Sequence, residues 1–278
     1  MKTNTVSLKQ IKFWFFCTCL LVLGVTGISG CASKSYGTGP AGDRVEMVTD
    51  SDEPDTRKRA RIRLELAVGY FEQGQTTIAL DELKQSIAAD PSYSDAYSLR
   101  GLIYMRLNDP QFAEESFKKA LSLSPRDSNV MHNLGWLLCQ HSRYTEAQQL
   151  FTQALSNAQY GERAKTFRAQ GLCLVRDGRR EEAEQSLLKS YEFDAGNPVT
   201  AYNLATLLFQ RGEYLRAQFY VRRLNNTELA NAETLWLGIK VEQRMQNRDA
   251  MLQLAAQLVK RFPQSREVGV YQRGAFDE

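Results

Sequence analysis

Histidine is the scarcest reactive residue in this 278-residue sequence, which has only two histidines and five cysteines. His132 and His141 lie nine residues apart with no third ligand at a metal-binding spacing, so we predict no zinc site. We expect His132 to line a surface groove and His141 to lie in a turn. The sequence also lacks a His-Glu-x-x-His motif and an ordered Ser, His and Asp set. We therefore expect no enzyme activity, no cofactor and no small-molecule substrate.

The sequence has no net charge once its first residues are set apart. Residues 1–30 contain Lys2, Lys9 and Lys12 and no acidic residue, so the rest of the chain holds 32 basic and 32 acidic side chains. A main partner made of nucleic acid requires a basic surface, so we expect none. We expect the local basic run at residues 57–63 to be a solvated helix face. The Asp and Glu side chains are likewise expected on outer, solvated faces.

What the sequence does contain is a repeat, best formed between Tyr97 and Pro125. Small residues at Gly101, Ala113 and Ala120 suit two antiparallel helices whose backbones approach closely. The first small residue recurs at steps of 34, 34, 36, 34 and 33 residues, at Ala67, Gly101, Gly135, Gly171, Ala205 and Gly238. An alanine of the second helix keeps the same steps, at Ala79, Ala113, Ala147, Ala183, Ala217 and Ala250. Two series in one phase predict six helix-turn-helix repeats.

This 34-residue period resembles the tetratricopeptide repeat (TPR) family over roughly residues 60–264. The resemblance implies an all-α, right-handed superhelical solenoid within a domain of residues 57–278, which ends in a short tail. The six units are expected near residues 60–93, 94–127, 128–163, 164–197, 198–230 and 231–264. Two extra residues near 158–161 predict a longer turn between the third and fourth units.

The N-terminus has the pattern of a secretory signal. Met1 to Lys12 is basic, residues 13–30 carry no charge, and small residues precede Cys31, which predicts a signal peptide of residues 1–30. The run from Ile28 to Cys31 is similar to a bacterial lipobox, which implies covalent lipid on Cys31 and stable membrane attachment. The alternative is an uncleaved membrane anchor. Because Ala32, not aspartate, follows the cysteine, we expect an outer-membrane protein that faces the periplasm.

Residues 31–56 are rich in Gly, Ser, Thr and Asp and have almost no apolar periodicity. We expect them to form a flexible tether between the lipid and the repeats.

Cys139 and Cys173 remain after the signal and the lipidated residue are set aside, and they lie on the first helices of adjacent repeats. Neighbouring helix axes are about 8–10 Å apart, whereas a disulfide needs Cα atoms within about 7 Å. We therefore expect two small buried residues, with a disulfide as the alternative.

The first helix of each unit lines the partner-binding surface in TPR arrays, and its exposed side chains recur every three or four residues. The candidate partner-binding groove comprises Leu64, Val68, Phe71, Leu102, Met105 and Trp136. It would accept an amphipathic helix or an extended peptide. Alternatively, the residues of the first unit pack beneath the tether or a neighbouring chain. The fourth unit is basic at Lys165, Arg168 and Arg176, and the fifth presents Tyr202 and Phe209.

The later repeats carry distinctive sequences: Tyr160-Gly161-Glu162-Arg163, Asn203-Leu204-Ala205, Leu235-Trp236-Leu237-Gly238 and Lys260-Arg261-Phe262-Pro263. Together with the lipobox and six repeats, the chain resembles the PilF/PilW type IV pilus biogenesis lipoproteins over roughly residues 31–272. The resemblance implies a pilotin, which binds secretin subunits and promotes their localisation and multimerisation at the outer membrane, with a role in twitching motility. Two other classes stay open: a periplasmic scaffold for peptidoglycan enzymes, and an accessory factor for outer-membrane protein assembly.

Overall fold

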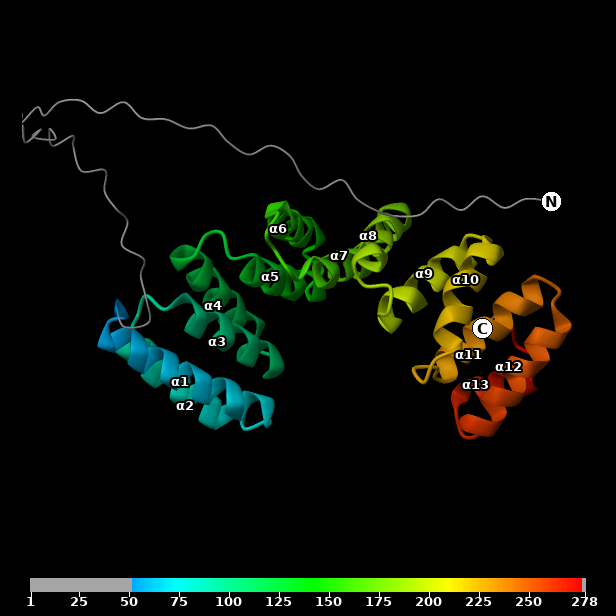
Figure 1. Cartoon of the computed structure of the whole chain (residues 1–278), viewed down its shortest axis with the longest axis horizontal. Coiled ribbons are helices and arrows are strands. Elements are labelled where there is room, and N and C mark those ends of the chain that lie inside the picture. The colour runs from blue at the N-terminus through cyan, green and yellow to red at the C-terminus, as the bar shows by residue number, and fades with distance from the viewer. Residues whose placement is uncertain (1–51, 277–278) are drawn as a thin grey trace, which may run out of the picture. The chain divides into compact units, whose positions relative to one another are not determined.

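The computed structural model describes residues 52–276, within the second of two compact units, which spans Val48–Glu278. The expected signal peptide, Cys31 and nearly all of the expected tether lie outside these residues. The described part of the chain is all-α, with thirteen helices and no strand (Figure 1). No helix among them has both the length and the apolar character needed to cross a membrane.

The helices alternate along the chain as six pairs and a final single helix, so the fold is a TPR solenoid. The first helices of the pairs are α1 (Asp55–Glu72), α3 (Ser94–Arg106), α5 (Ser128–Gln140), α7 (Arg163–Arg176), α9 (Pro198–Gln210) and α11 (Ala232–Arg244). The second helices are α2 (Thr76–Ala89), α4 (Pro110–Leu123), α6 (Tyr144–Ser156), α8 (Arg180–Phe193), α10 (Tyr214–Asn225) and α12 (Arg248–Arg261). Within each pair the two helices pack against each other, and each second helix packs on the next first helix up to α11.

The expected longer turn between the third and fourth repeats is confirmed. Six residues, 157–162, separate α6 from α7, whereas four residues, 124–127, separate α4 from α5. The turn between the two helices of each repeat has one residue in the left-handed region of backbone conformation. In the fourth repeat this residue is Gly178, with φ of 79°. Ser142 and Gln246 take that conformation with φ of 59° and 60° in the third and sixth repeats, although it favours glycine.

A small residue against a large one forms the contact between the two helices of a pair. Ala113 and Phe117 of α4 are fully buried, and a Cβ added to Gly101 of α3 would lie 2.5 Å from the Phe117 ring. The third repeat repeats the arrangement, because a Cβ on Gly135 would lie 2.9 Å from Phe151. These distances are too short for a methyl group, so glycine is what allows the large side chain to fill the space.

The prediction that Cys139 and Cys173 stay unpaired is wrong. They form a disulfide between α5 and α7, with Cα atoms 5.8 Å apart. The expectation applied the distance between helix axes to the Cα atoms themselves. Cα atoms lie on a cylinder of radius about 2.3 Å, so two that face each other are up to about 4.6 Å closer than the axes. The crossing of adjacent first helices therefore brings these cysteines within bonding range.

The expectation that acidic side chains lie on solvated faces is wrong for Glu242, which is fully buried in α11. Its carboxylate accepts hydrogen bonds from Gln218 Nε2, Arg222 Nε and Asn247 Nδ2 at 2.7–3.0 Å. A buried carboxylate needs such partners to offset the loss of hydration. Glu242 thereby joins the fifth repeat to the sixth.

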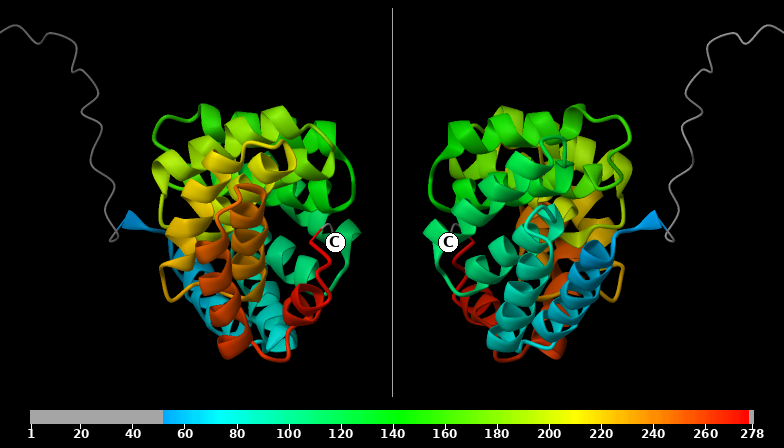
Figure 2. Two further views of the ribbon diagram at one scale, coloured as in Figure 1. Left: turned by 90° about the vertical axis from the view of Figure 1, so that its right-hand side faces the viewer. Right: turned by 90° about the vertical axis from the view of Figure 1, so that its left-hand side faces the viewer.

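Part of the expected C-terminal tail is helical. Helix α13 (Arg266–Gln272) is capped at its N-terminus by Ser265, whose side chain accepts a hydrogen bond from the Val268 backbone N–H. Val268 and Val270 are buried against α11 and α12, and the Phe276 ring stacks on Trp236 with centroids 5.5 Å apart. Figure 2 shows the stack from its two ends, with α1 and α2 in blue and cyan and α12 and α13 in orange and red. Helix α13 therefore covers apolar surface of the last repeat.

We predict that Gly101→Ala destabilises the protein by up to about 2 kcal/mol. Overpacking against Phe117 costs about 1–3 kcal/mol, and the better helix propensity of alanine offsets about 1 kcal/mol of it. In a Phe117→Leu background, which reproduces the Ala67 and Leu83 pair of the first repeat, the same change should be neutral or stabilising. Urea unfolding of the four chains gives the coupling free energy. An equal cost in both backgrounds would show that the ring is not the obstacle.

We predict that Cys139→Ala with Cys173→Ala lowers the free energy of unfolding by about 4 kcal/mol. The disulfide closes a loop with a sequence separation of 34 residues, and the lost loop-closure entropy of the unfolded chain sets the size of the effect. Thermal unfolding with and without a reductant measures it. Reduction should remove most of the difference between the two chains; a difference that survives reduction unchanged would assign the effect to packing instead.

Candidate protein-binding site

The first-helix face is the face of α1, α3, α5, α7, α9 and α11 that is turned away from the second helices. Five of the six candidate groove residues keep some exposed surface on α1, α3 and α5; the most exposed is Val68, at 37 %. The exception is Leu64, which is buried in the core shared by α1, α2 and α3. The structure therefore brings the candidates together on consecutive first helices, with Leu64 beneath the surface. Their role in binding stays a prediction.

Two aromatic side chains of this predicted groove are each covered by an arginine of the next repeat. The Arg106 guanidinium lies 3.8 Å from the Phe71 ring centroid, and its Nη1 donates a hydrogen bond to the Phe71 carbonyl at 2.7 Å. Arg176 lies 4.8 Å from the Trp136 ring centroid. The N-terminal groove is thus less apolar at its surface than the sequence suggested, because cation–π contacts screen the rings.

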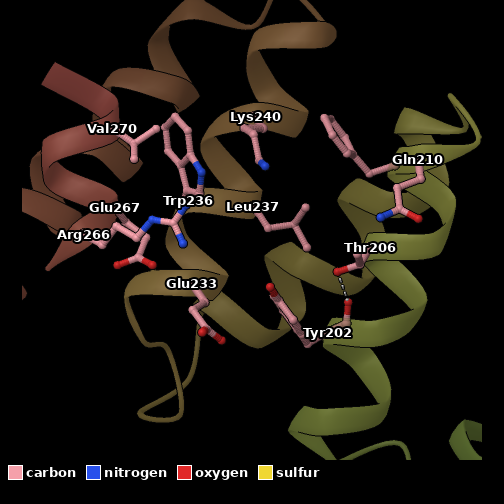
Figure 3. Close-up of a pocket in the computed structure, with 11 residues that line it drawn as sticks. Tyr202, Thr206, Gln210, Glu233, Trp236, Leu237, Lys240, Arg266, Glu267 and Val270 are labelled. Atoms are coloured by element: carbon pink, nitrogen blue, oxygen red, sulfur yellow. Dashed lines mark hydrogen bonds between the residues drawn. The ribbon is translucent and has the colours of Figure 1, made fainter. Parts of the chain in front are cut away.

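A pocket of about 470 Å³ lies at the other end of the array, between α9, α11 and α13. Figure 3 shows side chains from all three helices converging on it. The lining residues are Tyr202, Thr206, Phe209, Gln210, Glu233, Trp236, Leu237, Lys240, Arg266, Glu267 and Val270. No second helix contributes, so the pocket belongs to the first-helix face.

The pocket combines aromatic rings with both signs of charge. The Lys240 ammonium lies 5.7 Å from the Phe209 ring centroid and 5.5 Å from that of Trp236. Burial, with the negative charges of Glu233 and Glu267, raises the pKa of Tyr202 above its ordinary value. Tyr202 therefore stays a neutral phenol at physiological pH. Such a mixed lining suits a peptide segment with polar and apolar side chains.

The part of this pocket formed by α13 is not predicted by the sequence. The sequence places Tyr202 and Phe209 on the fifth first helix, but Arg266, Glu267 and Val270 belong to α13, within the expected tail. The available signal was Ser265, a favoured N-cap residue, followed by apolar residues at Val268 and Val270. A seven-residue helix is too short for periodicity alone to indicate it.

The prediction that His132 lines a surface groove is wrong. His132 is buried in α5, and its Nδ1 lies 2.9 Å from Thr166 Oγ1 of α7. The same hydroxyl lies 2.9 Å from the Tyr160 hydroxyl. The chain of three polar groups joins the long 157–162 turn to two first helices. The other histidine, His141, is exposed at the end of α5, as expected of a turn residue. Within residues 52–276, no three potential metal ligands come together.

Burial, with the positive charges of Lys165 and Arg168, lowers the pKa of His132 to about 4. Protonation of this imidazole is therefore unfavourable in the folded protein. The charges of Lys165 and Arg168, both on α7, therefore lie close enough to His132 of α5 to disfavour its protonation.

Comparison with known proteins supports the TPR fold and shows which proteins the chain resembles. Tetratricopeptide repeat models match residues 92–160 and 132–198, and a TPR repeat model matches residues 69–108. The chain is 28 % identical over 253 residues to the type IV pilus assembly protein PilF of Pseudomonas aeruginosa, an alignment that covers 91 % of this chain and 96 % of PilF.

Two solved structures agree with that relationship. The structure of P. aeruginosa PilF superimposes with a TM-score of 0.73 at 28 % identity, over 80 % of this chain and 100 % of that one. PilW, described as a widely conserved type IV pilus biogenesis factor, gives a TM-score of 0.69 at 27 % identity, over 77 % of this chain and 98 % of its own. The chain is a PilF/PilW-type tetratricopeptide repeat protein.

We predict that the free energy of unfolding of this PilF/PilW-type protein decreases at acidic pH because of His132. The unfolded pKa is near 6.5 and the folded pKa about 4, so the unfolded state binds more protons between these values. The contribution is fully present above pH 6.5 and is lost as the pH falls towards 4. Between pH 7.5 and 5 the loss is about 2 kcal/mol.

Urea unfolding at several pH values tests this, with wild type compared against His132→Gln. The variant should lose that part of the pH dependence, and His141→Gln at the exposed turn is the matched control. A pH slope that is equal in wild type and His132→Gln would contradict the assignment.

Proposed function

We propose that this chain takes part in type IV pilus biogenesis as an outer-membrane pilotin. In this proposal the protein binds secretin subunits and promotes their localisation and multimerisation. The observation that carries it is the relationship to PilF, which extends over 96 % of PilF and includes the whole of its solved structure. PilW, whose solved chain is covered to 98 %, is also described as a pilus biogenesis factor.

The architecture supports a binding role. Each first helix packs one side against its second helix and the neighbouring repeats. The first-helix face is therefore free to contact a partner. On that face the chain offers the groove from Val68 to Trp136 and the pocket lined by Tyr202 and Trp236. A secretin segment held there would be carried with the protein. Carriage does not require a catalytic group, which is why we assign no enzymatic role.

Attachment to the membrane is the second part of the proposal, and it depends on residues that the structure does not describe. Lipid on Cys31 would anchor the mature chain in the outer membrane, facing the periplasm, because several acyl chains give stable attachment where one does not. The stretch 31–56 would then let the array reach a secretin subunit.

Deletion of the gene tests the function directly. We expect heat-resistant secretin multimers to disappear from outer-membrane fractions, monomers to accumulate and twitching to be lost, with all three restored by the wild-type gene. A Cys31→Ser gene should restore none of them, because the protein would no longer be delivered with its lipid. Normal multimers in the deletion strain would overturn the pilotin function.

A second set of variants locates the binding surface. Val68→Glu with Phe71→Glu places two charges in the predicted groove and should abolish capture of the secretin while helical circular dichroism is unchanged. Leu215→Glu with Phe219→Glu is the matched control, because both side chains are exposed on the second helix α10. Equal capture of the secretin by both double variants would rule out the N-terminal groove as the binding surface. The pocket at Trp236 would then be the remaining candidate.

A further inference from the structure

Helix α7 differs from the other first helices in its charge. Its residues on the first-helix face are Lys165, Arg168, Leu172 and Arg176, which follow one another at three or four positions and so form one stripe. The residues of α7 that are buried lie on its other sides, towards α5 and α8: Thr166, Ala169, Gly171, Cys173 and Leu174. Three of the four residues in the stripe are therefore cations.

The neighbouring first helices hold no carboxylate at the corresponding positions. On α5 these positions are Asn129, His132, Trp136 and Gln140, and on α9 they are Val199, Tyr202, Thr206 and Gln210. The positive charge of α7 is thus not neutralised by the helices on either side of it. This local excess contrasts with the balance of 32 basic and 32 acidic side chains after residue 30.

Two of the three cations have no partner within residues 52–276. Lys165 and Arg168 form no hydrogen bond or ion pair there, whereas other arginines of the array bind carboxylates. Arg143 pairs with Glu114 and Glu146, for example, through N–O distances of 2.6 Å. Unpaired charges of one sign on an otherwise balanced protein are the electrostatic complement of an acidic ligand.

Apolar side chains accompany the cations. Leu172 follows Arg168 in the stripe, and Trp136 of α5 is half-buried with Arg176 over its ring at 4.8 Å. Arg176 Nη1 also lies 4.0 Å from Cys139 Sγ, and the disulfide fixes α5 against α7. The indole and the cations are therefore held at a set spacing, which reduces the entropy lost on binding.

We propose that this basic stripe, defined as Lys165, Arg168, Leu172 and Arg176 with Trp136, docks an acidic segment of a partner protein. The segment carries an apolar side chain between its carboxylates. From Lys165 to Arg176 the stripe spans about 16 Å of helix, which matches about five residues of an extended chain. This docking does not depend on the partner being a secretin. The competing occupant is the acidic stretch of this chain itself, residues 43–51.

Fluorescence anisotropy with the full-length protein in detergent tests the proposal. The probe is a labelled heptapeptide of six acidic residues around a central phenylalanine, and its counterpart has six lysines instead. The acidic peptide should bind at about 0.02 M salt and weaken at about 0.3 M, and the lysine peptide should not bind. Lys165→Glu with Arg168→Glu should weaken binding about tenfold or more. Lys58→Glu with Lys260→Glu, an equal charge change at exposed positions on α1 and α12, should change it little.

Three results would overturn the proposal. The first is no binding of the acidic peptide either by wild type or by a chain that lacks residues 43–51, and the second is equal weakening by both double variants. The third is binding that appears only after residues 43–51 are deleted, which would make the chain's own acidic stretch the occupant. Circular dichroism and thermal unfolding of each variant show that a loss of binding is not a loss of fold, and competition by the unlabelled peptide supplies a measurement that needs no variant.

Discussion

The close approach of a small residue on the first helix to a large one on the second is the contact on which the other features depend. Gly101 leaves room for the Phe117 ring, and with that ring in place the two helices pack as a pair. A single pair cannot bury its remaining apolar surface, so pairs must stack and share a core. Stacking uses the second helices and the edges of the first helices. The first-helix face is what remains, and its availability for a partner follows from the packing.

Contacts between repeats are individual, whereas the contact within a repeat recurs. The third and fourth repeats are joined by the Cys139–Cys173 disulfide and the His132–Thr166 contact. The fifth and sixth are joined through the buried carboxylate of Glu242. Each involves a residue that breaks the repeat pattern. Departures from the consensus therefore include residues that hold adjacent repeats in a fixed arrangement, in addition to residues on the binding surface.

The fold could be predicted almost completely from the sequence, because two series of small residues in one phase leave few arrangements open. The longer connection at 157–162 followed from the two extra residues in the repeat spacing. The burial of His132 and Glu242 could not be predicted. Whether a polar side chain faces solvent or a partner depends on a residue of the neighbouring repeat, such as Thr166 or Arg222. The pocket could not be predicted for a similar reason, since α13 completes it from a segment too short to show a period.

Basic and acidic side chains balance in number after residue 30, but they are unevenly distributed over the surface in a way that affects binding. Many carboxylates are used at the turns and the starts of second helices, where Glu146 binds Arg143 and Glu182 binds Arg179. Such exposed pairs contribute little to stability, but they neutralise the outer side of the array. On the first-helix face of α7, Lys165 and Arg168 lack such neighbours. Because unpaired charge selects partners by sign more than it adds affinity, the apolar residues of this face would supply the affinity and α7 the selection.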